Sequence, residues 1–321
     1  MDGAPIHVTS RAPAAYSRRI HDHHPMKSSI LSLLTALASP LLAGPCVPEQ
    51  ISPDAKWLVH ADFDAMRDSR TGQAVFSWLE ADQGKRVRAI SPFLAMQPLT
   101  GLHGITLYGN GSPGNAAALV DGKFDRALLE NLVRTTKGYA GFTHAGHTVH
   151  SWVEEGAKQH AAFASDNLLV FSREEEGLKK ALDAVAVPSP VQANPLLVAE
   201  EGKPLVVARA RFSEMTLPDD LSRLVKTVKA IRLAALESDG RFTLRASAEA
   251  ETGEDADRLR RMVDGVLAFA QMQDAKLEGL DLKSELNAVT QSPVFTAALS
   301  LPVGEWIGLM EEGAREAAPD Q

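Results

Sequence analysis

Three side chains that could bind a metal ion or transfer a proton stand at alternate positions of one apolar stretch, residues 51–66. They are His60, Asp62 and Asp64. The apolar and β-branched residues around them predict a strand, in which alternate side chains point to the same face. Imidazole and carboxylate groups on one face suit a divalent metal or general acid–base chemistry. A solvent-facing strand with ordinary polar residues has the same pattern, so the spacing supports both interpretations.

The second half of the chain contains a fainter copy of this stretch, residues 202–215, which also runs from a turn residue through an apolar strand to Phe and Met. Arg209 and Arg211 stand where the first copy has polar and acidic residues. The opposite charge adds a third interpretation, in which the two strand faces approach each other and Asp62 forms an ion pair with Arg209.

A second group of candidate ligands consists of four histidines within 17 residues, His144, His147, His150 and His160. Histidine clusters can bind zinc. His147 and His150 are three positions apart and would point to opposite sides of a strand. A hairpin could still bring His144 next to His150, so a metal site and a set of hydrogen-bonded surface histidines both remain open.

The other candidate motifs lack the context that their chemistry needs. The sequence GNGSPG at 109–114 resembles a phosphate loop, but it lacks the Lys-Ser/Thr ending and stands between two predicted strands. Ser151, Ser165 and Ser172 lie in no nucleophile elbow. We therefore predict no catalytic residue and no cofactor. The candidates for a metal site are the residues already described, His60, Asp62, Asp64, His144 and His150.

The charge of the chain argues against nucleic acid as a partner. The formal net charge is -8 over 321 residues. Removing residues 1–43 would take away four basic and two acidic residues and leave 29 basic residues against 39 acidic ones. Binding to nucleic acid or to anionic lipid needs a basic surface, which this composition does not supply.

The hydrophobic periodicity predicts an α+β fold in which antiparallel sheets are covered by helices on one face. Expected strands lie at 104–108, 116–120, 139–144, 147–153, 159–165, 168–172, 205–212, 230–237, 241–251, 283–290 and 294–301, besides the strand around His60. Expected helices lie at 71–83, 124–134, 174–185, 220–227, 254–273 and 304–317.

The order of these elements repeats, which suggests an internal duplication. Each half begins with a strand, continues through a helix and a hairpin, and ends in a helix. The expected organisation is an upstream segment with a signal peptide at 1–43, a first half at 44–187, a linker at 188–203 and a second half at 204–321. The pattern leaves open whether the two halves share one sheet.

The first residues predict export. From Met26, which we take as the initiator, the sequence has a basic Lys27, an apolar run over 30–37 and a processing site ending at Ala43. No later segment approaches about 18 consecutive apolar residues, so we expect no transmembrane segment in the mature chain. We expect the mature chain in the periplasm or outside the cell. The lone Cys46 cannot form an internal disulfide; an exposed thiol, an intermolecular disulfide and lipid attachment are the alternatives.

The beginning of the predicted mature chain resembles uncharacterised secreted bacterial proteins that contain domains of unknown function. The resemblance covers about twenty residues: the turn SPDA at 52–55, the strand that ends in acidic residues, and the element Ser69-Arg70-Thr71-Gly72. The second half departs from it, because Arg209 stands where the acidic strand end would be. The resemblance implies no activity and no functional residue.

These observations favour an exported binding or envelope-associated structural module without enzymatic activity. Its expected partner is a protein or another component of the cell envelope. The alternative is a secreted metal-dependent hydrolase that uses His60, Asp62 and Asp64. The apolar stripe of the helix expected at 254–273 fits either core packing or contact with a partner.

Overall fold

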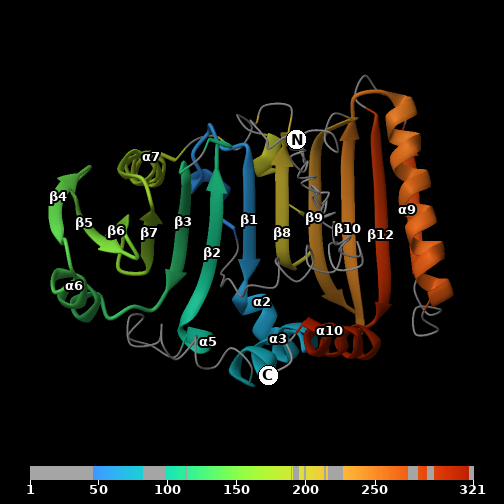
Figure 1. Ribbon diagram of the computed structural model, residues 1–321, viewed down its shortest axis with the longest axis horizontal. Helices are drawn as coiled ribbons and strands as arrows, with labels where there is room; N and C mark the ends of the chain where they lie inside the picture. Colours follow the sequence, from blue (N-terminus) through green and yellow to red (C-terminus); the bar gives the residue numbers. More distant parts are fainter. Residues whose placement is uncertain are drawn as a thin grey trace, which may run out of the picture. The chain divides into compact units, whose positions relative to one another are not determined.

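One antiparallel sheet of 12 strands is the framework of the chain, as the computed structural model shows (Figure 1). The structure describes residues 46–81, 98–112, 114–188, 190, 195–198, 200–212, 215, 227–273, 281–287 and 293–317. The predicted signal peptide and most of the helix expected at 220–227 lie outside these residues. No helix in the described ranges is both long and apolar enough to cross a membrane.

The strands follow the alternating apolar pattern of the sequence closely. Their bounds are β1 Trp57–Asp62, β2 Leu102–Gly109, β3 Ala116–Gly122, β4 Ala140–His144, β5 His147–Glu154, β6 Ala157–Phe163, β7 Leu168–Ser172, β8 Pro204–Arg211, β9 Val228–Ser238, β10 Arg241–Ala250, β11 Asp281–Asn287 and β12 Val294–Pro302. Their order in the sheet is β11-β12-β10-β9-β8-β1-β2-β3-β7-β6-β5-β4.

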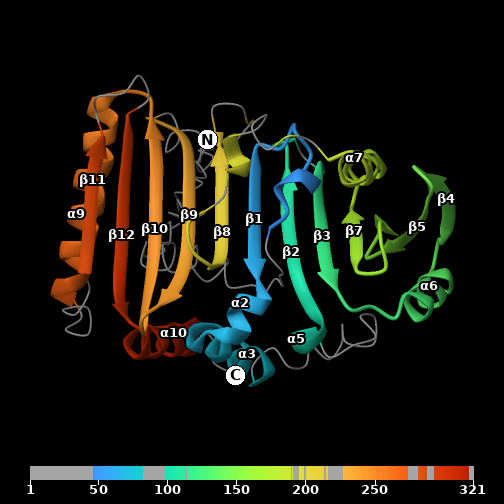
Figure 2. The same ribbon diagram turned by 180° about the vertical axis from the view of Figure 1, so that it is seen from behind.

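The helices connect and cover these strands. Their bounds are α2 Phe63–Asp68, α3 Arg70–Ala81, α5 Pro98–Gly101, α6 Arg126–Arg134, α7 Glu175–Ala186, α9 Gly253–Gln273 and α10 Val303–Ala317, with short 3-10 turns η2 at Pro48–Gln50 and η4 at Pro195–Leu197. α10 packs against α3, and α9 lies along β10, β12 and β11 (Figure 2).

The two strands that the sequence singled out lie side by side in the middle of the sheet. β1 pairs antiparallel with β8, with Leu58 opposite Arg209 and His60 opposite Val207. From this junction β2 and β3 continue the sheet in one direction, and β9 and β10 continue it in the other. The two predicted halves therefore share one sheet, which the sequence left open. The strand order by itself does not demonstrate a duplication.

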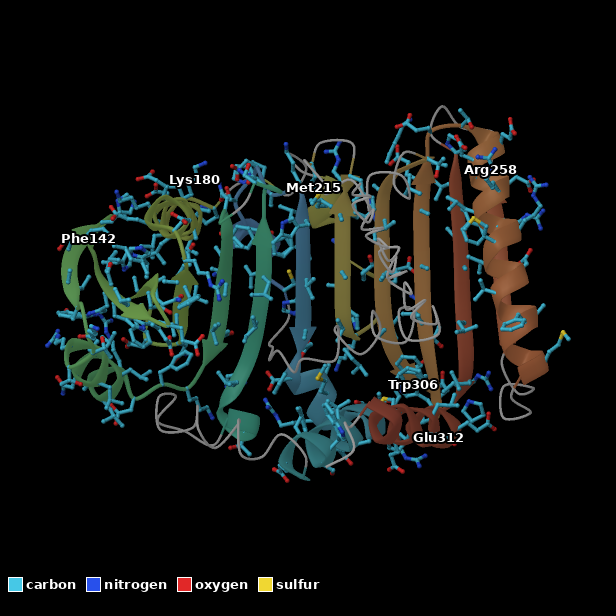
Figure 3. The ribbon with its side chains drawn as sticks, in the orientation of Figure 1. Phe142, Lys180, Met215, Arg258, Trp306 and Glu312 are labelled. Atoms are coloured by element: carbon cyan, nitrogen blue, oxygen red, sulfur yellow. The ribbon has the colours of Figure 1, made fainter. Side chains whose placement is uncertain are left out.

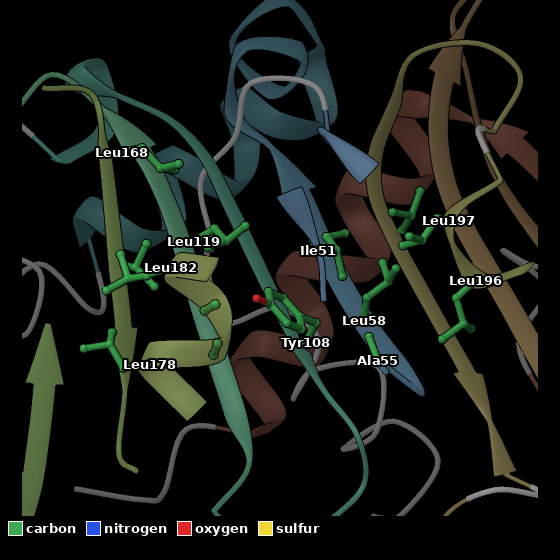
Figure 4. Packing of buried hydrophobic residues seen from close by; sticks show 14 of the residues in the cluster. Ile51, Ala55, Leu58, Tyr108, Leu119, Leu168, Leu178, Leu182, Leu196 and Leu197 are labelled. Carbon is green, nitrogen blue, oxygen red and sulfur yellow. The ribbon is translucent and has the colours of Figure 1, made fainter. Parts of the chain in front are cut away.

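Buried residues lie on both faces of the central strand. Leu58 belongs to a large core cluster with Leu178 and Leu182 of α7 (Figure 4). Ala61 belongs to a second cluster, with Phe63 of α2. Residues three apart on a strand point to opposite faces.

The strand around His60 is shorter than the sequence predicts, because a helix begins immediately after Asp62. The Asp62 carboxylate accepts a hydrogen bond of 2.7 Å from the backbone N–H of Ala65 and so caps α2. α3 follows directly, and the packing between the two helices is tight at Gly72. A Cβ atom at this position would lie 2.2 Å from the backbone oxygen of Met66.

A third core cluster lies where α10 meets β10 and β12. It contains Phe242, Leu301 and Val303, and the ring of Trp306 stacks on Phe242 with a centroid distance of 4.0 Å (Figure 3). This contact fixes the position of α10, because the helix begins directly after β12 and its Trp306 packs on Phe242 of β10.

Candidate functional site

His60, the first of the predicted metal ligands, lies inside the protein. Its side chain is 4% exposed. The ring Nδ1 is 2.9 Å from the Thr106 hydroxyl, and Thr106 is the residue directly opposite on β2. The expectation of a solvent-facing polar strand is therefore wrong at this position. The hydrogen bond compensates for burying an imidazole among apolar residues.

Asp62 and Asp64 serve helix α2 and do not join His60. Asp62 caps the helix, and burial raises the pKa of its carboxyl above the ordinary value. Asp64 lies in the first turn of α2, where it pairs with Arg67 and with His103 Nδ1, 3.0 Å away. Among the residues that the structure describes, no group of three or more His, Cys, Asp or Glu side chains could hold a metal ion.

Arg209 is buried and pairs with the segment predicted as the linker instead of with Asp62. Its guanidinium donates to the backbone oxygen of Leu196 and to the Glu200 carboxylate, 3.0 Å away. Burial lowers the pKa of Arg209, and Glu200 acts in the opposite direction. The predicted ion pair between Asp62 and Arg209 is therefore wrong. Arg209 lies opposite Leu58, several residues from the end of β1 where Asp62 caps its helix.

Cys46 lies near this arginine, half-buried against the large core cluster. Burial raises the pKa of its thiol to about 11, although the charge of Arg209 and a hydrogen bond to Thr106 act in the opposite direction. Of the three alternatives for Cys46, a fully exposed thiol does not agree with this half-buried position. A thiol with a raised pKa is a poor nucleophile at neutral pH.

The second group of histidines is separated by the strand pairing. In the hairpin of β4 and β5, His144 lies opposite His147, and His150 lies opposite Gly141. The expectation that the hairpin brings His144 next to His150 is therefore wrong. His144 Nε2 is 2.7 Å from the Asp183 carboxylate on α7, and His147 Nδ1 is 3.0 Å from the backbone oxygen of Phe163. The proposed metal at these residues stays a prediction.

His150 takes part in a small polar network between β5 and α6. Its Nδ1 is 3.1 Å from the Tyr139 hydroxyl, and its Nε2 is 4.0 Å from the Glu130 carboxylate. Glu130 also accepts hydrogen bonds from Arg126 and Arg134. The His150 side chain is buried, and its burial lowers its pKa. The hydrogen bond from Arg126 lowers the pKa of Glu130 and so favours its ionised form.

A serine and a histidine that sequence reasoning did not connect form a hydrogen bond on the next strand pair. The Ser151 hydroxyl is 2.7 Å from His160 Nδ1, and the two residues are register partners in β5 and β6. A hydroxyl beside an imidazole can act as an activated nucleophile. Here the two residues are 9% and 3% exposed, and burial lowers the pKa of His160. Only the hairpin register could have revealed this pair, because neither residue lies in a motif.

Among the helices that the structure describes, the most exposed apolar side chains lie on α9 (Figure 3). Met262, Val266, Phe269 and Met272 are 54%, 55%, 62% and 83% exposed. Leu259 and Ala256 are more buried, so only part of the apolar stripe covers the sheet. The sequence left core packing and partner contact open for this helix.

Comparisons with known proteins give a likeness of fold at most. No protein-family model matches the chain, and no curated protein matches it. Among solved structures, crystal form III of TP0453 is similar with a TM-score of 0.47 at 8% identity, over 84% of this chain and 99% of the other. Crystal form I of TP0453 has a TM-score of 0.44 at 8% identity, over 84% of this chain and 98% of the other.

Proposed function

We propose that this chain is an exported, non-enzymatic binding module of the periplasm or the extracellular space, and that α9 is its binding surface. The observation that carries the proposal is the row of exposed apolar residues on α9, Met262, Val266, Phe269 and Met272. Such large apolar residues are seldom left together in water without a partner.

The spacing of the row favours a helix as the partner. Leu259, Met262, Val266 and Phe269 follow one another at intervals of three, four and three residues. Apolar residues at alternating intervals of three and four form the contact face between two helices of a coiled coil. Methionine adapts its shape to a partner, and the aromatic ring adds contact area. The occupant that we propose is an amphipathic helix of another exported protein.

The polar residues of the described chain support binding over catalysis. His60, His150 and the pair of Ser151 and His160 each have a hydrogen-bond partner within the protein and lie below the surface. A catalytic group needs a substrate within hydrogen-bond reach, and these buried groups offer none.

We also propose that the two halves arose by duplication. The support is the order of strands on each side of the junction of β1 and β8, where each half contributes its opening strand first and then a hairpin. The division at residues 188–203 remains part of this proposal.

Photo-crosslinking from α9 tests the binding function. A photoreactive phenylalanine derivative replaces Phe269 in the full chain, and a matched variant carries it at Val187, which is 75% exposed at the end of α7. We expect position 269, and not 187, to crosslink to one other protein, at a segment that mass spectrometry maps to an amphipathic helix.

A further substitution distinguishes a specific helix–helix contact from non-specific binding through exposed apolar side chains. Val266→Glu places a charge in the middle of the row and should abolish the adduct from position 269, whereas Arg261→Glu on the exposed polar side of the helix should leave it intact. Adducts to lipid, adducts to a second copy of this chain, or no adduct at position 269 would each overturn the proposal.

A further inference from the structure

Among the residues that the structure describes, one end of the sheet is an open strand edge. β11, Asp281–Asn287, is the last strand in the order, and within the described chain it pairs only with β12 (Figure 2). Its pairing with β12 runs over seven residues without a register shift, and it contains no proline. An edge strand of this kind presents a row of backbone N–H and C=O groups that can pair with another strand.

The residue types along β11 match those of a second copy of the same strand. We propose that β11 pairs antiparallel with β11 of another molecule around a two-fold axis through Ser284. This register places Leu282 opposite Leu286 and Lys283 opposite Glu285, and the symmetry repeats each pair. Opposite charges in directly opposing positions stabilise an antiparallel pair.

The neighbouring registers are less favourable, which makes the match specific. Directly opposing residues of an antiparallel pair point to the same face of the sheet. A two-fold axis perpendicular to the sheet keeps every side chain on its own face, and neighbouring residues point to opposite faces. The axis must therefore pass through a residue and cannot lie between two residues. An axis through Lys283 would oppose two lysines, and an axis through Glu285 would oppose two glutamates. Like charges in directly opposing positions destabilise a strand pair. An axis through Leu282 also opposes unlike charges, Asp281 and Lys283, but it pairs only residues 281–283 of the strand with their counterparts, whereas the axis through Ser284 pairs all seven residues.

The dimer joins the two sheets into one and does not depend on the partner proposed for α9. A two-fold axis perpendicular to the sheet leaves both copies of α9 on the same face of the joined sheet. Each copy of α9 stays packed along β10, β12 and β11 of its own molecule. The exposed row of Met262, Val266, Phe269 and Met272 is thus presented twice on one face.

Charge exchange in the purified full chain tests the pairing. Sedimentation velocity should show a reversible dimer for the unaltered chain. Lys283→Glu and Glu285→Lys each oppose like charges twice, and each should raise the dissociation constant by about tenfold. The double variant K283E/E285K restores unlike pairs and should dimerise as the unaltered chain does. Lys158→Glu, in β6 at the far side of the sheet, is the matched control and should have no effect.

A cysteine at the axis tests the register. Ser284→Cys should form a disulfide between two copies under mild oxidation, since directly opposing residues of an antiparallel pair are close enough for one. Thr296→Cys on β12 is exposed but away from the edge, and it should form no such link. The variants stay informative because circular dichroism reports separately whether each folds.

Three results would overturn the pairing. They are a monomeric unaltered chain at its highest soluble concentration, a double variant weaker than both single variants, and equal crosslinking at positions 284 and 296. Each can occur while crosslinking from Phe269 persists, so a failure of the dimer is distinguishable from a failure of the proposed α9 function.

Discussion

Polar residues that look reactive in the sequence are used for internal hydrogen bonding in the folded protein. His60 contacts Thr106, Ser151 contacts His160, and Arg209 contacts Glu200. A buried polar group without a partner costs about 1–3 kcal/mol, so such contacts are required for the fold to be stable. The presence of histidine, serine and arginine at these positions is therefore explained by hydrogen bonding of buried polar groups and does not require a reactive site.

Two buried histidines, His150 and His160, should make the stability of the protein depend on pH. Burial lowers the pKa of His150 and of His160 from the ordinary value of 6.5. In the unfolded chain both protonate near their ordinary pKa, whereas in the folded chain they stay neutral to lower pH. The unfolded state then binds more protons, so the free energy of unfolding should fall as the pH drops through and below 6.5.

Urea unfolding at about pH 7.5 and about pH 5.5 measures this effect. The double variant H150Q/H160Q keeps a polar side chain at both positions but cannot gain the proton. We expect its free energy of unfolding to change less between the two pH values than that of the unaltered chain. Equal changes in the two proteins would contradict the assignment to these histidines.

At the scale of elements, helix α3 is tied to a strand far away in the sequence. The Glu237 carboxylate on β9 accepts hydrogen bonds of 3.0 Å from the backbone N–H of Arg70 and 2.7 Å from that of Thr71, in the first turn of α3. Burial raises the pKa of Glu237, but the hydrogen bonds from Thr71 and Arg70 outweigh it and hold the pKa below the ordinary value. A carboxylate at a helix N-terminus is stabilised by the helix dipole.

Removing this carboxylate should weaken the protein measurably. Glu237→Ala leaves two N–H groups of α3 without their acceptor, and we expect the free energy of unfolding to fall by about 1–2 kcal/mol. Glu237→Gln keeps an acceptor and loses the charge, so a smaller fall of about 1 kcal/mol is expected. Denaturant unfolding measures both.

The matched control for Glu237 is Glu154→Gln, at an exposed strand end. It should change the free energy of unfolding by less than about 0.5 kcal/mol. If Glu237→Ala is as mild as this control, the contact between β9 and α3 does not contribute to stability.

At the scale of the whole described fold, the junction of β1 and β8 makes the two predicted halves interdependent. Leu58 of β1 and Val207 of β8 belong to the same core cluster. α10 of the second half packs on α3 of the first, next to the contact made by Glu237. Separating the halves would expose two strand edges together with their apolar neighbours.

We therefore expect that neither residues 44–187 nor residues 188–321 fold alone. Circular dichroism of each fragment should show no cooperative thermal transition, and mixing the two should restore one, because the junction can form between separate chains. The full chain should unfold in a single transition. A fragment that melts cooperatively at the temperature of the full chain would show that the halves are independent.

The sequence alone determined most of the elements, because a strand or a helix follows from the local period of its apolar residues. The hairpins at 140–154 and 228–250, the helix at 253–273 and the closing helix at 303–317 lie within a few residues of their predicted positions. The predicted strand at His60 was too long, because an apolar residue after Asp62 fits a helix start as well as a strand.

The tertiary structure decided which residues meet. The pairing of β1 with β8 joins strands about 150 residues apart. It places His60 and Arg209 inside the protein, and the register of β5 and β6 makes Ser151 the partner of His160. Local periodicity records which face of an element is apolar, but it does not record which element will cover that face. The sequence therefore identified most of these polar residues as candidates, but only the assembled sheet shows which of them are buried and which pair with one another.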